Sequence, residues 1–220
     1  MPIPDTTLSP TVDGYVARNG ELTWDLAHDN IGGDIYADAV SASSIAIRAS
    51  YSPSGRGAGY YVTRSFFRFD TSDINFIPKS ASFRVRGYIT STITAIACVK
   101  ANFGASLDLG DFDNIEGWDP ARNNSGNVTY YASNSSSWST SGHNVFTLNN
   151  TALSDISGMD NLEICLLDVN SDLNNTGGDI PPPSSTNYSG VNFVDHGTSS
   201  YRPSIRITHQ DNAISFGTNF

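Results

Sequence analysis

The chain has 220 residues, of which 38% are hydrophobic and 15% charged, and its formal net charge is −10. A chain of this length can bury roughly 70% of its unfolded surface in one core, so we expect one domain. The acidic balance argues against nucleic acid as a partner, because phosphate binding needs a basic surface. No apolar run approaches the roughly 18 residues of a membrane span, so no membrane partner is expected.

Eleven segments carry the alternating pattern of β-strands and end in clusters of Gly, Pro, Asn or Ser. In chain order they are residues 14–18, 22–26, 44–49, 60–69, 82–90, 94–101, 127–132, 144–148, 161–168, 190–194 and 204–208. This pattern predicts an all-β fold, an antiparallel β-sandwich of jelly-roll type with under about 10% helix. We expect a single sandwich domain at residues 12–209, between an extended N-terminal arm at 1–11 and a C-terminal tail at 210–220.

The most informative strand is residues 60–70, which read Tyr-Tyr-Val-Thr-Arg-Ser-Phe-Phe-Arg-Phe-Asp. Phe67 and Phe69 fall on one face of this strand, so we expect both rings in the core. Helix is scarce, and we expect one short helix at 150–156 and a turn within 107–118.

The strand at residues 82–89 has two different faces. Phe83 and Val85 alternate with Arg84 and Arg86. The apolar face should pack on the core, and the arginine face should meet solvent or a partner.

The two cysteines, Cys98 and Cys165, each lie inside an apolar strand pattern. Buried free thiols that pack as small hydrophobic side chains fit this setting best, and a disulfide is the alternative. Neither cysteine has surroundings that favour a reactive thiolate or a metal site. No cofactor is expected.

Four stretches of the chain together suggest a family. They are Thr11-Val12-Asp13-Gly14-Tyr15-Val16, Arg64-Ser65-Phe66-Phe67-Arg68-Phe69-Asp70 leading into Ser72-Asp73-Ile74, Ile77-Pro78-Lys79-Ser80-Ala81-Ser82-Phe83-Arg84-Val85, and Tyr201-Arg202-Pro203-Ser204-Ile205-Arg206-Ile207. In this order they resemble the DNRLRE-type, carbohydrate-binding-module-like jelly rolls of secreted polysaccharide-active and cell-surface proteins. The resemblance implies a β-sandwich, often with a glycan-related role, and supplies no nucleophile or acid–base pair. Residues 102–161 depart from the family pattern, so no glycan-binding residue is carried over.

The first residues, Met-Pro-Ile-Pro-Asp, have neither the basic nor the apolar region of a secretory signal. A domain of secreted type without an export signal suits a bacteriophage protein, which is made in the host cytoplasm and leaves in the virion by lysis. The leading interpretation, by analogy, is a non-enzymatic structural protein of a bacteriophage particle, as a capsid decoration or cement protein or a head or tail fibre component that could also adhere to a surface glycan. The alternative is a stand-alone carbohydrate-binding module for host or algal polysaccharide, and an enzyme comes third.

Carboxylates cluster at two places where hard oxygen ligands could hold Ca²⁺. One cluster comprises Asp108, Asp111, Asp113, Glu116 and Asp119, and the other comprises Asp172, Asn174 and Asp179. Turn-forming residues on a solvated surface explain the first cluster equally well, and no metal site is assigned at either cluster. The four histidines lack ligand spacing, and the sequence alone does not reveal a facing pair of catalytic carboxylates. No catalytic residue is assigned.

Exposed aromatic rings are the remaining candidates for sugar binding. Trp138 lies in a Ser-rich loop, and Tyr188 lies in the long loop at 171–189. Both are candidate glycan-binding residues. The alternative is that both rings fold back as anchors of their loops.

The terminal arms carry apolar side chains that suit contacts with another subunit, namely Ile3, Leu8, Ile214, Phe216 and Phe220. Each can return roughly 1.5 to 3 kcal/mol if it is buried, which offsets part of the entropy lost when an arm is ordered. We therefore expect a homo-oligomer, with a trimer preferred by analogy with other jelly-roll assemblies, and other virion subunits as partners.

Overall fold

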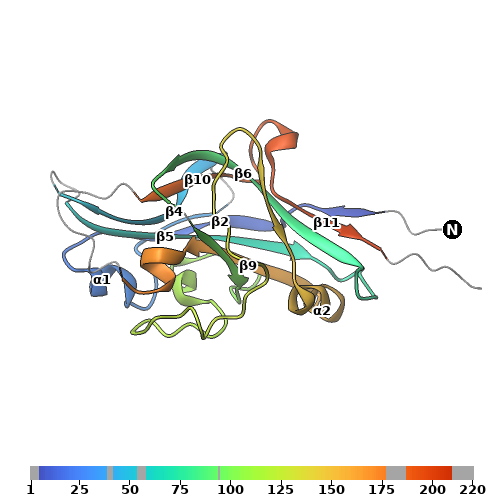
Figure 1. The fold of residues 1–220 in the computed structure, drawn as a ribbon, viewed down its shortest axis with the longest axis horizontal. Helices are drawn as coiled ribbons and strands as arrows, with labels where there is room; N and C mark the ends of the chain where they lie inside the picture. The colour runs from blue at the N-terminus through green and yellow to red at the C-terminus, as the bar shows by residue number, and fades with distance from the viewer. Residues whose placement is uncertain (1–4, 39–41, 54–57, 94, 177–186, 210–220) are drawn as a thin grey trace, which may run out of the picture.

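The computed structural model describes residues 5–38, 42–53, 58–93, 95–176 and 187–209. Its strands join into one curled sheet in which paired strands run antiparallel (Figure 1). They are β1 (Thr6–Leu8), β2 (Val12–Glu21), β3 (Ile35–Asp38), β4 (Ser43–Ser52), β5 (Gly59–Asp70), β6 (Ser80–Ser91), β7 (Ile96–Lys100), β8 (His143–Thr147), β9 (Asn161–Asp168), β10 (Tyr188–Asn192) and β11 (Ser204–Thr208).

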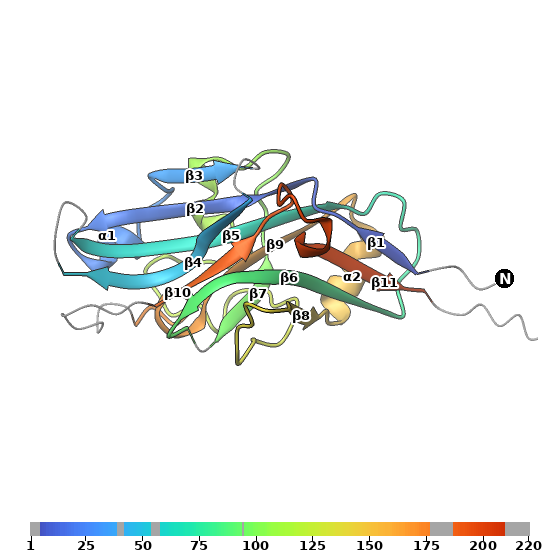
Figure 2. The ribbon, with the colours of Figure 1, turned by 90° about the horizontal axis from the view of Figure 1, so that it is seen from above.

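Figure 2 shows β3, β2, β5, β4, β10 and β6 side by side in the curled sheet, which folds over into two layers around one core. We call β1, β11, β6 and β8 the short sheet, and β10, β4, β5, β2, β3, β9 and β7 the long sheet. Strand β10 pairs with both β4 and β6 and so joins the two. Strand β5 is central in the long sheet, because it pairs with β2 along one edge and with β4 and then β9 along the other. The predicted all-β antiparallel sandwich is confirmed.

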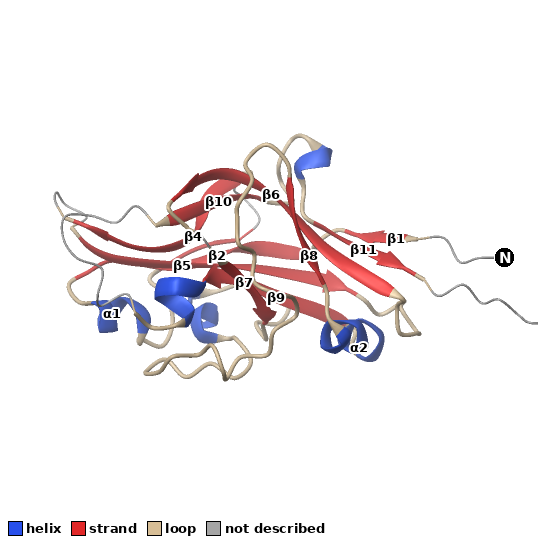
Figure 3. Cartoon of the chain, in the orientation of Figure 1, coloured by secondary structure: helices blue, strands red, loops and turns tan. Residues whose placement is uncertain are grey.

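The helical segments are short and lie outside the strands of the sheets (Figure 3). They are α1 (Trp24–His28), the 3-10 turn η1 (Leu109–Asp113), α2 (Asn150–Gly158), the π-helical turn η2 (Val169–Leu173) and the 3-10 turn η4 (Ser199–Tyr201). The structure is 15% helical, more than the tenth we predicted. The predicted helix at 150–156 is confirmed. No helix within the described ranges is long and apolar enough to cross a membrane.

Two predicted strands are wrong. Residues 22–26 instead lead into α1, because the Thr23 hydroxyl accepts a hydrogen bond from the Leu26 amide and caps the helix. Residues 127–132 form only isolated bridges to neighbouring strands. Strands β1 and β3 were not predicted.

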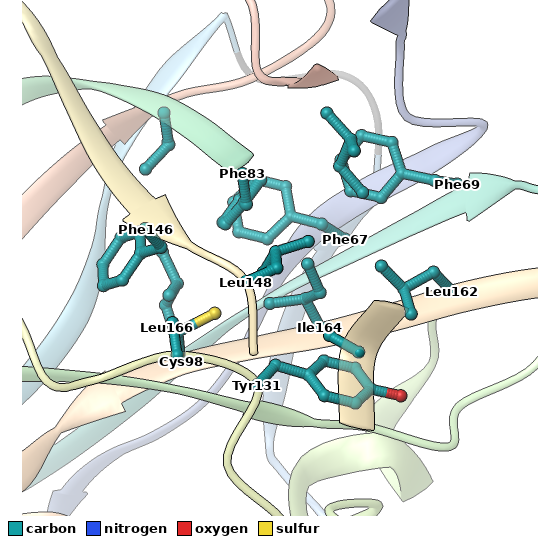
Figure 4. Packing of buried hydrophobic residues seen from close by; sticks show 14 of the residues in the cluster. Phe67, Phe69, Phe83, Cys98, Tyr131, Phe146, Leu148, Leu162, Ile164 and Leu166 are labelled. Carbon is teal, nitrogen blue, oxygen red and sulfur yellow. The ribbon is translucent and has the colours of Figure 1, made fainter. Parts of the chain in front are cut away.

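Phe67 and Phe69 both point into the core between the two sheets, as predicted, and both are fully buried. Figure 4 shows Phe67 beside Phe83, and their ring centroids lie 5.0 Å apart. Phe83 is stacked in turn with Phe146 from β8 at 6.0 Å. These rings connect the long sheet to the short sheet.

The other face of the long sheet carries a second apolar cluster. Val62 and Phe66 of β5 pack there with Trp24 of α1, Phe112 of η1 and Leu173 of η2. We call the segments that cover this face, namely α1, residues 101–130 with η1, and η2, the outer layer. The long sheet is thus buried on both faces, which explains the near-continuous apolar run in β5.

The cysteines are buried and free, as predicted. Cys98 packs in the core between the sheets, whereas Cys165 packs on the opposite face of the long sheet. Burial raises the pKa of both thiols, so neither is a nucleophile at neutral pH.

The N-terminal arm belongs in part to the sandwich. Residues Thr6–Leu8 pair with Ile205–Ile207 of β11, and Leu8 packs against the core of its own chain. The sheet therefore begins at β1, before the predicted boundary at residue 12, and the subunit-contact role of Leu8 stays a prediction. Ile3 and the C-terminal tail, with Ile214, Phe216 and Phe220, lie outside the described residues.

Replacing Phe67 with Ala should lower the free energy of unfolding by roughly 3 to 5 kcal/mol, because it opens a cavity between the sheets. Urea titration followed by circular dichroism measures this loss. Leu22→Ala is the matched control, since Leu22 is 84% exposed and its truncation should stay within about 0.5 kcal/mol. A loss below about 1 kcal/mol for Phe67→Ala would show that the ring does not carry the core contact.

Candidate functional site

The centre of the long sheet carries a fully buried arginine. Arg64 lies on β5, on the same face as Phe66, and none of its surface is exposed. Its Nε and Nη2 donate hydrogen bonds to the two carboxylate oxygens of Asp172, at 3.0 and 2.8 Å. Its Nη1 donates to Asp113 at 2.9 Å. A bidentate pair of this kind is among the stronger and more directional contacts in proteins.

Aromatic rings enclose the guanidinium. Its central carbon lies 4.0 Å from the ring centroids of both Phe112 and Trp118, a distance at which ring faces attract a cation. The Arg64 Nη1 also donates to the Phe112 carbonyl oxygen at 2.8 Å. These contacts replace the water that the guanidinium lost on burial.

A buried histidine extends this cluster to α1. The His28 Nε2 lies 2.8 Å from the Asp172 carbonyl oxygen, and its Nδ1 lies 2.6 Å from a carboxylate oxygen of Asp29. The imidazole ring lies between Trp24 and Trp118, with ring centroids 5.1 and 5.4 Å away. We call Arg64, Asp172, Asp113 and His28 the Arg64 cluster.

The Arg64 cluster fastens the outer layer to the long sheet. Its members come from β5, η2, η1 and α1, segments far apart in the sequence. Arg64, Asp172 and His28 are each 0% exposed, so a ligand does not reach them. The arrangement suits a structural brace rather than a catalytic centre.

Electrostatics within the cluster keep the arginine charged. Burial by itself lowers the pKa of Arg64, but the Asp172 and Asp113 carboxylates outweigh it and raise that pKa above its ordinary value. Burial raises the pKa of Asp113, and the nearby Arg64 charge opposes this rise.

Asp168 is a second buried carboxylate beside the cluster, with 0% exposure. Its Oδ2 accepts a hydrogen bond from the Ser171 amide at 2.6 Å and so caps η2. Its Oδ1 is buried and has no hydrogen-bond partner among the residues described. Burial, together with the Asp172 charge, raises the pKa of Asp168 to about 6.

The first carboxylate cluster considered for Ca²⁺ is used for capping and ion pairing. Asp108 and Asp111 cap η1 reciprocally, and Asp113 pairs with Arg64. Glu116 pairs with Lys100 at 3.0 Å, and Asp119 pairs with Arg122 at 3.0 Å.

In the second cluster, Asp172 is the bidentate partner of Arg64 and Asn174 ends η2. Asp179 lies outside the described residues. No group of three metal-ligating side chains that could hold an ion occurs in the described ranges.

The two aromatic residues considered for glycan binding are placed differently. Trp138 is only 8% exposed, and its Nε1 donates to the Gly190 carbonyl oxygen at 3.2 Å. This placement contradicts an exposed binding ring and fits the alternative, in which Trp138 anchors its loop. Tyr188 is half-buried at the start of β10, opposite Arg48. The structure shows no contact between the two rings within the described residues.

An open cleft of about 250 Å³ lies beside Lys100 and Glu163. Three of its four charged lining residues, Lys100, Glu116 and Glu163, form ion pairs. Lys100 Nζ lies 3.0 Å from Glu116 and 3.1 Å from Asp155, and Glu163 lies 3.3 Å from Arg68. Asp160 is the charged lining residue for which the described part of the chain provides no ion pair.

The outward face of the short sheet differs, because its arginines form no ion pair with a carboxylate among the residues that the structure describes. Arg84 and Arg86 of β6 point outward while Phe83 and Val85 are buried, as predicted. Arg206 of β11 is exposed on the same face. The remaining basic side chains nearby are His143, opposite Arg86 in β8, and Arg202, just before β11. We call these five basic residues the arginine face.

The arginine face borders a pocket of about 350 Å³. The pocket is lined by Arg84, His143, Arg202, Arg206, Pro203 and the hydroxyl residues Thr7, Ser9, Ser199, Ser200 and Ser204. None of these residues is acidic. The sequence indicated the face through the alternation in β6, but the contributions of His143 and Arg202 follow only from the pairing of distant strands.

Comparisons with known proteins add no assignment. The chain matches no protein-family model, and no curated protein matches it. The DNRLRE-type resemblance stays a prediction that rests on the strand motifs.

Replacing Arg64 with Met should lower the free energy of unfolding by roughly 3 to 5 kcal/mol, because it leaves the Asp172 carboxylate buried and unpaired. The double variant Arg64→Met with Asp172→Leu should recover part of this loss. Arg122→Met is the control, since Arg122 is 74% exposed and its pair should contribute less than about 1 kcal/mol. Equal losses of unfolding free energy for the Arg64 and Arg122 variants would contradict the structural role of the Arg64 cluster.

The stability of the chain should also depend on Asp168. Because its pKa rises from 3.8 to about 6 on folding, the folded state binds this proton more tightly than the unfolded state. The resulting penalty is present above pH 6 and is relieved as the pH falls from 6 toward 3.8. Relative to Asp168→Asn, the free energy of unfolding should rise on the order of 2 to 3 kcal/mol between pH 7 and pH 4. A difference that is flat with pH would contradict this.

Proposed function

We propose that the chain is a non-enzymatic structural protein of a bacteriophage particle, as a capsid decoration or a component of a head or tail fibre. The observation that supports this proposal most directly is that several of its charged residues stabilise the fold through contacts within the chain. Arg64, Asp172 and Asp113 brace the outer layer, and Asp108 and Asp111 cap a turn. Such bracing on one face and an aromatic core on the other suit a protein that must stay folded outside a cell.

The exposed surface supports an attachment role. Four of the five residues of the arginine face lie on regular strands and only Arg202 lies on a connecting segment, so the sandwich largely fixes the shape of the face. A rigid, charged face of this kind suits contact with a particle subunit or a surface molecule. The preferred assembly is a homotrimer.

A stand-alone carbohydrate-binding module is the second candidate. The pocket beside the arginine face favours it, because hydroxyl and guanidinium groups there can donate hydrogen bonds to sugar oxygens. In this version the chain adheres to host or algal polysaccharide without being part of a particle.

The proposal is tested by purifying particles from a culture that produces the chain and quantifying the chain by mass spectrometry. We expect it to band with the particles in a density gradient, at a fixed multiple copy number. Mass photometry of the isolated chain should give three times the mass of one chain.

A chain found only in the free protein fraction would contradict the particle role. A monomer at micromolar concentration would contradict the trimer. Binding to a neutral polysaccharide without any particle association would favour the second candidate.

A further inference from the structure

The geometry points to the pocket beside the arginine face as a binding site for one oxyanionic group, a carboxylate, sulfate or phosphate, free or carried on a small sugar. The inference goes beyond the proposed particle role, because it concerns what the isolated chain binds.

The first observation in support is that the strands around the pocket carry no acidic side chain to neutralise its arginines. The four strands of the short sheet, β1, β6, β8 and β11, contain no Asp or Glu. Arg84, Arg86, Arg202 and Arg206 form no ion pair with a carboxylate in the part of the chain that the structure describes, whereas Arg18, Arg64, Arg68 and Arg122 each do. Arg48 and Lys79 also lack a carboxylate partner in the described ranges, so what distinguishes these four arginines is that they lie together around one face.

The second support is the convergence of basic groups from separate strands. In the strand register Arg84 lies opposite Ser204 on one side and Val145 on the other, and Arg206 lies opposite Ser82. Arg84 and Arg206 are therefore diagonal neighbours on one face. Like charges so placed repel each other, and an anion between them relieves the repulsion.

Burial strengthens this effect at Arg84. The Arg84 Nε is buried and has no hydrogen-bond partner among the described residues. Burial and the Arg206 charge lower the pKa of Arg84. Burial and the charges of Arg84 and Arg86 likewise lower the pKa of His143, against a hydrogen bond with the Arg202 backbone. An anion in the pocket would supply the missing opposite charge.

Two further contacts restrain basic side chains of the arginine face. The Arg202 Nε donates to the His196 carbonyl oxygen at 2.9 Å, and the Arg86 guanidinium lies 3.7 Å from the Tyr201 ring centroid. These contacts restrain two of the long side chains before any ligand arrives. Less conformational entropy is then lost on binding.

The size and charge of the site limit the ligand. A volume of about 350 Å³ is at the lower end of small-molecule pockets, which span roughly 300 to 1,000 Å³. The acidic remainder of the chain opposes a long polyanion such as nucleic acid. At physiological salt the screening length is about 8 Å, so the local arginines dominate for a small anion. The hydroxyls of Ser199, Ser200 and Ser204 can contact the atoms that carry the anionic group.

Nuclear magnetic resonance titration of the full chain tests the site. The probes are sodium sulfate, sodium phosphate, sodium acetate and sodium glucuronate, with glucose as the neutral probe and sodium chloride at matched ionic strength as the salt control. We expect the oxyanions, but not glucose or chloride, to shift the amides of Arg84, His143, Ser204 and Arg206. Tighter binding of glucuronate than of acetate identifies a sugar-borne ligand, and equal binding identifies the free anion.

The variants are Arg84→Gln and Arg206→Gln, with Arg122→Gln as the matched loss of one exposed positive charge. Arg206 is exposed, so its variant should fold even if Arg84→Gln does not. Each pocket variant should weaken binding about tenfold or more, which corresponds to the roughly 1.4 kcal/mol of one charge-assisted contact, and Arg122→Gln should leave it within twofold. Absence of oxyanion-specific shifts, or equal weakening by all three variants, would overturn the inference. Such a failure leaves the particle proposal intact, because particle association is measured separately.

Discussion

A guanidinium that is taken out of water must be neutralised where it lies, because a buried charge without a partner costs several kcal/mol. Arg64 is fixed on β5, the central strand of the long sheet. The carboxylates that neutralise it must therefore be supplied by other segments of the chain. Asp172 lies on the turn that follows β9, and Asp113 lies on η1. Neither segment can leave the sheet without leaving a charge unpaired. The position of the outer layer therefore depends on this one side chain.

The two sheets use charge in opposite ways. On the long sheet, Arg64 and its carboxylate partners are paired inside the protein and serve stability. On the short sheet, Arg84 and Arg206 stay on the outward face without a carboxylate partner in the described ranges. The aromatic core between the sheets keeps these two regions apart, so a ligand at the arginine face need not disturb the brace. Because of this separation, the long sheet carries the stabilising ion pairs and the outward face of the short sheet remains accessible for contacts.

Much of the fold could be predicted from sequence because long strands carry a complete alternating pattern, as in residues 161–168 and 204–208, whose bounds were predicted correctly. Short edge strands such as β1 were missed because pairing with β11, and not local sequence, stabilises them. The Arg64 cluster was missed because Arg64 and Asp172 are 108 residues apart. One signal for the Arg64 cluster was present in the sequence. Apolar residues occur on both faces of β5, which indicates that both faces are buried, and an arginine at the centre of such a strand must then find its partners inside the protein.

Amide hydrogen exchange in the Arg64→Met variant tests most directly whether Arg64 holds the outer layer. Two amides bonded to outer-layer carbonyls report on it. The Gly33 amide, between α1 and β3, is bonded to the Leu109 carbonyl at 2.6 Å, and the Asn124 amide is bonded to the Leu173 carbonyl at 2.8 Å. The account predicts that both lose far more protection than the amides of β11 in the short sheet, because the outer layer opens locally. Equal loss of protection in the outer layer and in β11, or no loss in the outer layer, would contradict it.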